Sequence, residues 1–311
     1  MTEVNPSRYV AQRENTHAFG EKFVEEFRRH IPFPTDDVPA KLWHYTTRSG
    51  LIGILDSREL RATDLRFLND TQERRYALRV YRDLLSRRLK NEREMAARVL
   101  LLAARSNTDS RLFAGAAYTF SFSEDGDDLS QWRAYTQARS AYSLAFDSRS
   151  IARLTSTAHV FGPFRCRYKR PEQEAFLEEV MSRSLLLDVE RHFDRLDAAT
   201  LAAARVLFTN MLVSITGMVL KHPRFEAEHE WRLVLITRPE ATLGFRDGRT
   251  MLTPYCALGP VSSVSDLGIR EIVIGPTPHA RNEKIAVGAL LEQRGCKEVK
   301  VRASRIPFRN W

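Results

Sequence analysis

The segment from residue 225 to residue 236, FEAEHEWRLVLI, changes from alternating polar and apolar residues to a continuous apolar run. This pattern predicts a strand that enters a core. Successive side chains on a strand point to opposite faces, so Glu228, Glu230 and Arg232 would share one face. The other face would carry His229, Trp231 and Leu233. We expect the Trp231 face to be buried and the carboxylate face to border a groove or solvent.

Elsewhere the apolar pattern mixes strands and helices without a regular alternation of the two. Strands are predicted at residues 41–46, 116–123, 143–146, 161–168, 271–274 and 297–302. Helices are predicted at residues 16–30, from 49, 71–105, from 129, 171–221 and 282–293. This order favours an α+β fold over a doubly wound parallel sheet.

A proline-rich stretch divides the chain near its start. IPFPTDDVP, residues 31–39, contains three prolines and predicts a linker or extended strap. We therefore expect residues 1–40 to form an N-terminal helix and strap. Residues 41–311 would form a single α+β domain with a helical insert at about residues 171–222.

The composition favours a cytoplasmic protein. The 311 residues allow a sizeable core, and no apolar run approaches the roughly 18 residues that cross a bilayer. The N-terminus lacks the basic-then-apolar pattern of a signal peptide. Cys166, Cys256 and Cys296 are too few and too widely spaced for a disulfide framework or a CxxC metal pair. We expect no membrane attachment and no structural metal.

Positive charge is concentrated in one predicted helix. The formal net charge is +9, and ten Lys and Arg residues lie between Arg74 and Arg105. Two interpretations stay open: a solvated helix face, or a surface that binds an anionic macromolecule such as nucleic acid.

The paired carboxylates also allow two interpretations. Like charges that are close together raise each other's pKa unless a cation such as Arg232 lies beside them. Glu228 and Glu230 would then stabilise a cation that develops during a reaction. Alternatively, they belong to a solvated strand edge with Arg232 as an ion-pair partner. The phosphate-binding, nucleophile-elbow and HExxH motifs are absent, so spacing alone assigns no activity.

Five motifs, taken in order, resemble those of a bacterial family, domain-of-unknown-function family 2971, over residues 41–311. They are HYT (44–46), FLNDTQE (67–73), FSFS with WRAY (120–135), EHEWR (228–232) and IVIGPTP with SRIPFR (272–309). The same plan is similar to the ADP-ribosyltransferase fold, in particular to DarT-type enzymes that modify nucleic acid. This resemblance implies a split β-sheet core with helical flanks.

The resemblance also implies a function. The chain would be an NAD-dependent mono-ADP-ribosyltransferase that modifies a macromolecule, nucleic acid in particular, in a bacterial toxin or phage-defence role. NAD would be a substrate, and an antitoxin or defence protein would be a partner. The alternatives are a non-catalytic nucleic-acid-binding or accessory module of the same fold, and an NAD glycohydrolase.

The resemblance assigns roles to individual residues. Glu230 would be catalytic, with Glu228 as the first carboxylate of an E-x-E pair. The residues that would contact NAD are His44, Tyr45, Thr46, Ser121, Ser123, Trp132 and Tyr135. Trp132 and Tyr135 are equally consistent with core packing, since they are three residues apart on one helical face.

A further polar group has no settled counterpart in the transferase pattern. Asn69, Asp70 and Glu73 would bind the target or hold a loop. Arg232, beside the carboxylates, would bind the substrate. Asn69 or Asp70 is equally consistent with an N-cap of the basic helix.

Overall fold

A computed structural model describes most of the chain after the proline-rich stretch. The described residues are 38–68, 73–93, 117–136, 141–155, 160–185, 216–236, 243–248 and 251–308. The predicted N-terminal helix, the pair Asn69 and Asp70, and residues 186–215 of the predicted insert lie outside these ranges. None of the helices in the described ranges is long and apolar enough to cross a membrane.

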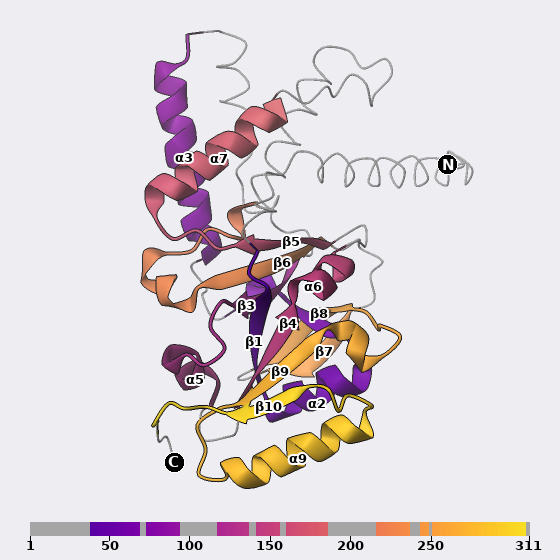
Figure 1. The fold of residues 1–311 in the computed structure, drawn as a ribbon. Helices are drawn as coiled ribbons and strands as arrows, with labels where there is room; N and C mark the ends of the chain where they lie inside the picture. The colour runs from indigo at the N-terminus through magenta and orange to yellow at the C-terminus, as the bar shows by residue number, and fades with distance from the viewer. Residues whose placement is uncertain are drawn as a thin grey trace, which may run out of the picture.

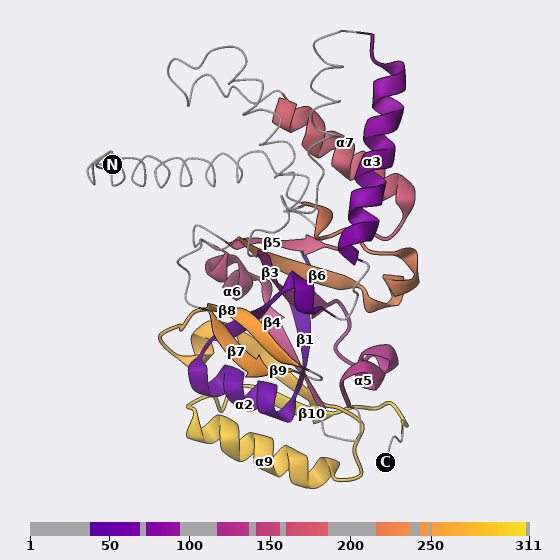
Figure 2. The same cartoon turned by 180° about the vertical axis from the view of Figure 1, so that it is seen from behind.

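The described elements form a mixed α+β architecture around one ten-stranded sheet (Figures 1 and 2). The strands are β1 (Lys41–Thr47), β2 (Leu60–Asp64), β3 (Ala117–Ser123), β4 (Ala141–Asp147), β5 (Val160–Arg165), β6 (Glu230–Ile236), β7 (Gly244–Asp247), β8 (Leu252–Leu258), β9 (Ile269–Ile274) and β10 (Lys300–Ala303). The main path runs in the order β10-β9-β4-β1-β3-β2-β8-β7. Only the β9–β10 pair is parallel among these strands. The predicted α+β class is confirmed.

Helices cover both faces of this sheet. The α-helices are α2 (Arg48–Ser57), α3 (Glu73–Asn91), α5 (Leu129–Thr136), α6 (Ser148–Leu154), α7 (Arg170–Leu185) and α9 (Ala280–Gln293). The 3-10 helices in the described ranges are η1 (Leu65–Phe67), η4 (Pro223–Glu228) and η5 (Val264–Leu267). The helices α2 and α9 lie at one end of the molecule, and α3 and α7 project from the other (Figures 1 and 2).

The sheet forks at β3. Along one edge, β3 pairs with β6 over its whole length, from Ala117↔Ile236 to Ser123↔Glu230. The other edge is shared: β1 pairs at Trp43↔Ser123, and β2 pairs at Thr63↔Thr119 and Asp64↔Tyr118. Beyond this fork, β5 and β6 run across the ends of β1 and β4 in both views (Figures 1 and 2).

Alternation along β3 separates two cores. Tyr118, Phe120 and Phe122 point to the face covered by α2 and α9, where they join the largest apolar cluster. On the opposite face, Val234 of β6 belongs to a second cluster with α3 and α7. The period-two pattern that predicted these strands therefore also decides which helices each side chain meets.

The predicted strand at residues 225–236 begins later than expected. Residues Pro223–Glu228 form η4, His229 adopts a left-handed conformation with φ 41°, and β6 begins at Glu230. Pro223 at the first turn favours a helix start, because its φ is already helical and its missing N–H would have no partner there. Glu228 thus lies outside the strand that carries Glu230.

Candidate functional site

His44 of β1 lies at the fork of the sheet. Its ring stacks on Phe120 with a centroid distance of 4.1 Å and an interplanar angle of 25°. Nδ1 lies 2.8 Å from the carbonyl oxygen of Ser121. Since a carbonyl only accepts hydrogen bonds, Nδ1 carries the proton in the neutral ring and Nε2 is left as an acceptor. Burial lowers the pKa of His44 to about 4, so the ring is neutral at pH 7.

Tyr45 and Trp132, two of the predicted NAD contacts, belong to the third core cluster. The Tyr45 hydroxyl donates to the Asp125 carbonyl oxygen at 2.8 Å and accepts from the Asp128 backbone N–H at 2.9 Å. Trp132 is fully buried, packs edge-on against Tyr45, and donates from Nε1 to Asp127 at 2.8 Å. These contacts hold the acidic loop against β1. Thr46 is also buried, and the side chain of Tyr135 lies outside the described part.

The serines of β3 lie on the face opposite to Phe120. Ser123 donates from Oγ to the Glu228 carbonyl oxygen at 2.9 Å and so ties β3 to the end of η4. Ser121 is directly across from Arg232, and Ser123 is directly across from Glu230. The β3 serines and the predicted catalytic strand are therefore neighbours on one face of the sheet.

Glu230 is buried in an ion cluster. Its carboxylate accepts from Arg232 Nε at 2.7 Å, from Arg232 Nη2 at 2.9 Å and from Lys221 Nζ at 2.6 Å. The expectation that the carboxylate face borders a groove or solvent is wrong, because Glu230 and Arg232 face the cluster under α3 and α7. Two cations offset the cost of burying this charge.

Glu73 completes the cluster from the start of α3. Its carboxylate accepts from Arg232 Nη1 and from Arg232 Nη2, the latter at 3.1 Å. Arg232 also donates to the Met218 carbonyl oxygen at 2.5 Å. Glu228 pairs with Lys221 at the rim, where its side chain is 34% exposed. The five charged groups are three carboxylates and two cations (Glu73, Glu228, Glu230, Lys221 and Arg232).

The pKa values follow from this arrangement. Although burial opposes ionisation, Arg232 and Lys221 lower the pKa of Glu230 to about 2. Burial would also lower the pKa of Arg232, but Glu230 and Glu73 raise it well above its usual value. Glu228 differs: burial raises its pKa, and Lys221 only partly opposes this. Glu230 is thus held fully ionised, and Glu228 is the more easily protonated of the two.

His44 and Glu230 lie on opposite faces of β3. His44 stacks on Phe120, whereas Glu230 is across from Ser123, and these two β3 residues point to opposite faces because they are an odd number apart. The strands that carry them do lie on either side of β3, with Trp43, Ser123 and Glu230 in one row across the sheet. The strands of the HYT and EHEWR motifs therefore lie close together, but the side chains of His44 and Glu230 are on opposite faces of the sheet.

Lys221 is the member of the cluster that the sequence did not single out. It precedes η4 and lies nine residues before Glu230, so no strand or helix period relates the two. In the described positions, no group of three or more His, Cys, Asp and Glu side chains could hold a metal ion. The cluster is held by its own Lys and Arg side chains.

The outer face of α3 carries a stripe of positive charge. Tyr81, Leu84 and Leu85 face the core, and the opposite side of the helix is exposed. What we call the α3 stripe consists of the exposed cations of this side and of one cation two residues beyond the end of the helix: Arg75, Arg79, Arg82, Lys90 and Arg93.

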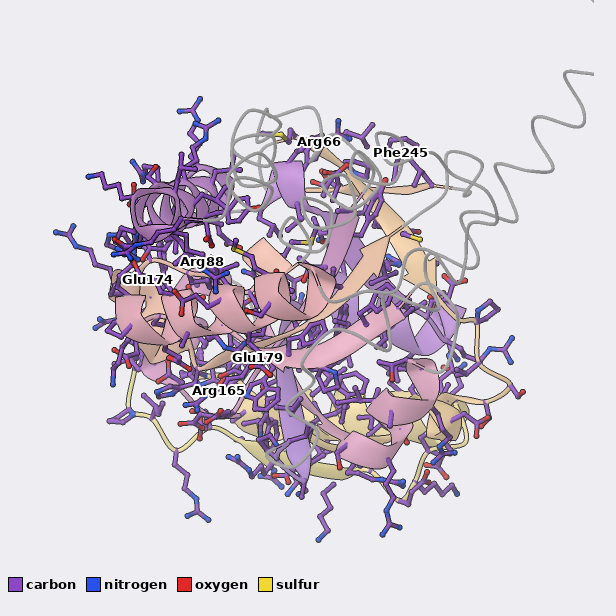
Figure 3. The ribbon with its side chains drawn as sticks, turned by 90° about the horizontal axis from the view of Figure 1, so that it is seen from above. Arg66, Arg88, Arg165, Glu174, Glu179 and Phe245 are labelled. Carbon is purple, nitrogen blue, oxygen red and sulfur yellow. The ribbon has the colours of Figure 1, made fainter. Side chains whose placement is uncertain are left out.

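The inner side of α3 forms two ion pairs with α7. Arg87 pairs with Glu174 at 2.6 Å, and Arg170 of α7 pairs with Asp83 at 2.8 Å. Figure 3 shows the two helices side by side, with Arg88 and Glu174 at their contact. These ion pairs lie on the α7 side of the helix, and the α3 stripe lies on its exposed side.

Comparison with protein-family models matches the middle of the chain. Residues 131–233 match the family model described as "Protein of unknown function (DUF2971)". This range runs from α5 to β6 and includes Glu228, Glu230 and Arg232. No curated protein and no solved structure matches the chain.

Proposed function

We propose that the chain binds nucleic acid and that the α3 stripe contacts the phosphate backbone. The carrying observation is that four cationic side chains share the exposed side of α3 and a fifth, Arg93, follows the end of the helix, while α3 forms ion pairs with α7 on its other side. A helix of 19 residues is about 28 Å long. Such a row of charges along a rigid element matches a polyanion better than a small ligand.

The stripe gives a quantitative expectation for salt dependence. Five phosphate contacts give a slope of log K against log salt of about −3.5 for single strands and about −4.5 for duplex DNA. Neutralising three of the five cations makes the slope for single strands less negative by about 2. At 0.1 M salt this corresponds to a loss of about 100-fold in affinity.

The test is fluorescence anisotropy with labelled single-stranded DNA, single-stranded RNA and duplex DNA at several salt concentrations. The variant is Arg75→Gln/Arg79→Gln/Lys90→Gln. The matched control is Arg149→Gln/Arg281→Gln/Lys284→Gln, which removes the same charge from exposed positions elsewhere. The proposal fails if both triple variants lose affinity equally, or if the wild-type protein shows no salt-dependent binding.

A second candidate function is ADP-ribosyl transfer from NAD to the bound nucleic acid, in the toxin or phage-defence setting. One observation favours it: β1, β3 and β6, which carry three of the family-like motifs, are adjacent at the Trp43–Ser123–Glu230 row. Cleavage of the ribose–nicotinamide bond develops positive charge, which an ionised carboxylate stabilises. Since Glu230 is engaged by two cations, Glu228 at the rim is the more accessible carboxylate.

Labelled NAD distinguishes the two candidates. Transfer predicts nicotinamide release, label on nucleic acid, and loss of both in Glu228→Gln or Glu230→Gln protein that stays folded. A glycohydrolase would release nicotinamide without labelling an acceptor. Salt-dependent binding without nicotinamide release would support the non-catalytic binding function and exclude transfer.

A further inference from the structure

The hairpin of β7 and β8 forms an edge of the sheet and exposes apolar side chains there. Among the described elements, β7 pairs with β8 alone. Phe245 of β7 is 59% exposed and Leu252 of β8 is 64% exposed. Leu252 is directly across from Asp247, which is two residues from Phe245, so Phe245 and Leu252 share one face. Leu243, just before β7, and Met251, just before β8, are also exposed. An exposed apolar edge is a place where another strand can pair.

The backbone of β7 has hydrogen-bonding groups that point away from β8. In an antiparallel pair, alternate residues direct their N–H and C=O groups toward the neighbouring strand. Phe245 is across from Pro254, which has no N–H, and Gly248 donates to the Met251 carbonyl oxygen at 3.1 Å. The even-numbered residues of β7 therefore bond to β8, and the main-chain groups of Phe245 and Asp247 face outward.

Two other edge strands of the described sheet carry features that discourage pairing. β10 carries the exposed Lys300, and β5 contains Pro163 and ends at the exposed Arg165. Charged side chains and prolines are common means of protecting an edge strand. β7 contains no proline, and Nη2 of its Arg246 donates to Thr63 Oγ1 of β2 at 2.7 Å, so this charge is drawn back over the sheet.

We propose that β7 pairs with the same strand of a second copy of this chain, antiparallel and across a two-fold axis. Such a pair covers both free edges at once, because each copy supplies the strand that the other lacks. A strand added to a sheet edge gains affinity from main-chain hydrogen bonds and specificity from the side chains beside them.

The side chains of β7 select one register for this pairing. Outward-facing residues are opposite one another, so two registers keep three residues of each β7 paired. The register centred on Arg246 would place two guanidinium groups directly opposite each other, which is destabilising. The register centred on Phe245 places its ring beside the partner's Phe245 and leaves room for Arg246 next to the partner's Gly244. In this second register the strand is complementary to a copy of itself.

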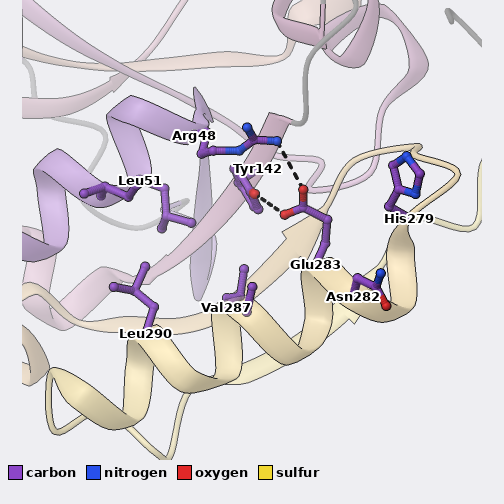
Figure 4. Close-up of a pocket in the computed structure, with 10 residues that line it drawn as sticks. Arg48, Leu51, Tyr142, His279, Asn282, Glu283, Val287 and Leu290 are labelled. Atoms are coloured by element: carbon purple, nitrogen blue, oxygen red, sulfur yellow. Dashed lines mark hydrogen bonds and ion pairs between the residues drawn. The ribbon is translucent and has the colours of Figure 1, made fainter.

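The hollow between α2 and α9 is less suited to a partner. Its polar end is already paired within the chain, because Glu283 accepts from Arg48 and from the Tyr142 hydroxyl (Figure 4). Ile285 of α9 is exposed but does not line this hollow. It therefore supplies a control position for an exposed apolar side chain away from β7.

The β7 edge is also distinct from the α3 stripe. Figure 3 shows Phe245 apart from Arg88 and Glu174, where α3 meets α7. Failure of the pairing proposal would leave the α3 stripe unaffected, and the reverse also holds.

Sedimentation velocity over a wide range of protein concentration tests the association. We expect a shift from a species of 35.8 kDa to one of twice that mass as the concentration rises. Phe245→Lys places a charge at the centre of the pairing and should weaken association at least about tenfold. Ile285→Lys is the matched control and should associate like the wild-type protein. The proposal is overturned if the wild-type protein stays monomeric at every concentration, or if both variants associate equally.

Disulfide crosslinking tests the register. Residues opposite each other in a hydrogen-bonded antiparallel pair have Cα atoms about 5.5 Å apart, within reach of a disulfide. Phe245→Cys should therefore crosslink two copies under mild oxidation. The two residues at position 247 would be roughly 14 Å apart, so Asp247→Cys should not crosslink. The wild-type protein, which keeps Cys166, Cys256 and Cys296, controls for the native thiols. Equal crosslinking of the two variants, or a preference for Asp247→Cys, would contradict this register.

Discussion

Arg232→Met tests whether the buried ion cluster anchors α3 to the sheet. Arg232 makes two hydrogen bonds to Glu230, two to Glu73 and one to the Met218 carbonyl. Methionine removes all five but keeps much of the aliphatic volume. Glu230 retains Lys221, whereas Glu73 loses its only ion-pair partner in the described part of the chain.

The size of the loss follows from that unpaired carboxylate. Removing one partner of a buried ion pair costs about 3–5 kcal/mol, since the other charge stays buried without compensation. For a chain of 311 residues, the entropy of unfolding is about 0.65 kcal/mol per degree, so 4 kcal/mol lowers Tm by roughly 6 °C. Urea denaturation followed by circular dichroism and calorimetry measure the two quantities.

Arg270→Met is the matched control. Arg270 pairs with Asp147 at 2.9 Å, but its side chain is 48% exposed, so its removal should cost no more than about 1 kcal/mol. The double variant Glu73→Leu/Arg232→Met should recover part of the lost stability, because it removes the orphaned charge as well. Equal stabilities of Arg232→Met and Arg270→Met, or no recovery in the double variant, would refute the reasoning.

Three other predictions concern single side chains. The pKa of His44 is lower in the folded state (about 4) than in the unfolded state (about 6.5), so the unfolded chain binds more protons between these values. About 3 kcal/mol of stability present above pH 6.5 should be lost as the pH falls to 4, and His44→Gln should flatten this slope in urea titrations. Asp127→Ala removes the acceptor of Trp132 Nε1 and should cost about 1–3 kcal/mol, with altered tryptophan fluorescence as the readout. Gly268→Ala should lower the Tm of the protein, because φ of Gly268 is 76° and the new Cβ would lie 2.2 Å from Ser150 Cβ. Gly288→Ala in α9 should raise the stability by about 0.5–1 kcal/mol, measured as a higher Tm, because its new Cβ has no atom within contact distance.

The alternation of apolar residues correctly predicted which side chains of β3 and β6 are buried, because the period of each strand alone determines this. Trp231 and Leu233 are buried on one side of β6, and Phe120 and Phe122 are across from them on β3. Each of these residues follows the period of its own strand. Local pattern is sufficient at such positions, because a shift of one residue would expose the whole apolar set.

The environment of Glu230 was not predictable in the same way. Its partner Arg232 binds Glu73, which lies 159 residues before Arg232 in the sequence. Lys221, its other partner, belongs to a segment without a regular apolar period. Alternation shows that Glu230 and Arg232 share a face, but the depth of that face depends on whether α3 and α7 cover it. The proline at position 223 and the left-handed His229 likewise separated Glu228 from the strand.

The buried cluster also has a consequence for binding. Glu73 is the first residue of α3, so the ion pair with Arg232 fixes the start of the helix that carries the α3 stripe. A phosphate-binding row of charges is most effective when its spacing is held before the ligand arrives, because ordering after binding opposes association. Glu230 keeps Arg232 in the orientation that reaches Glu73, through its bonds to Nε and Nη2.

A change at Glu230 should therefore weaken nucleic-acid binding even though Glu230 is buried. Glu230→Gln should weaken binding less than Arg232→Met does, because glutamine can still accept a hydrogen bond from Arg232. If Glu230→Gln abolishes nicotinamide release while stability and anisotropy titrations match the wild type, the carboxylate acts in chemistry and not as an anchor of α3.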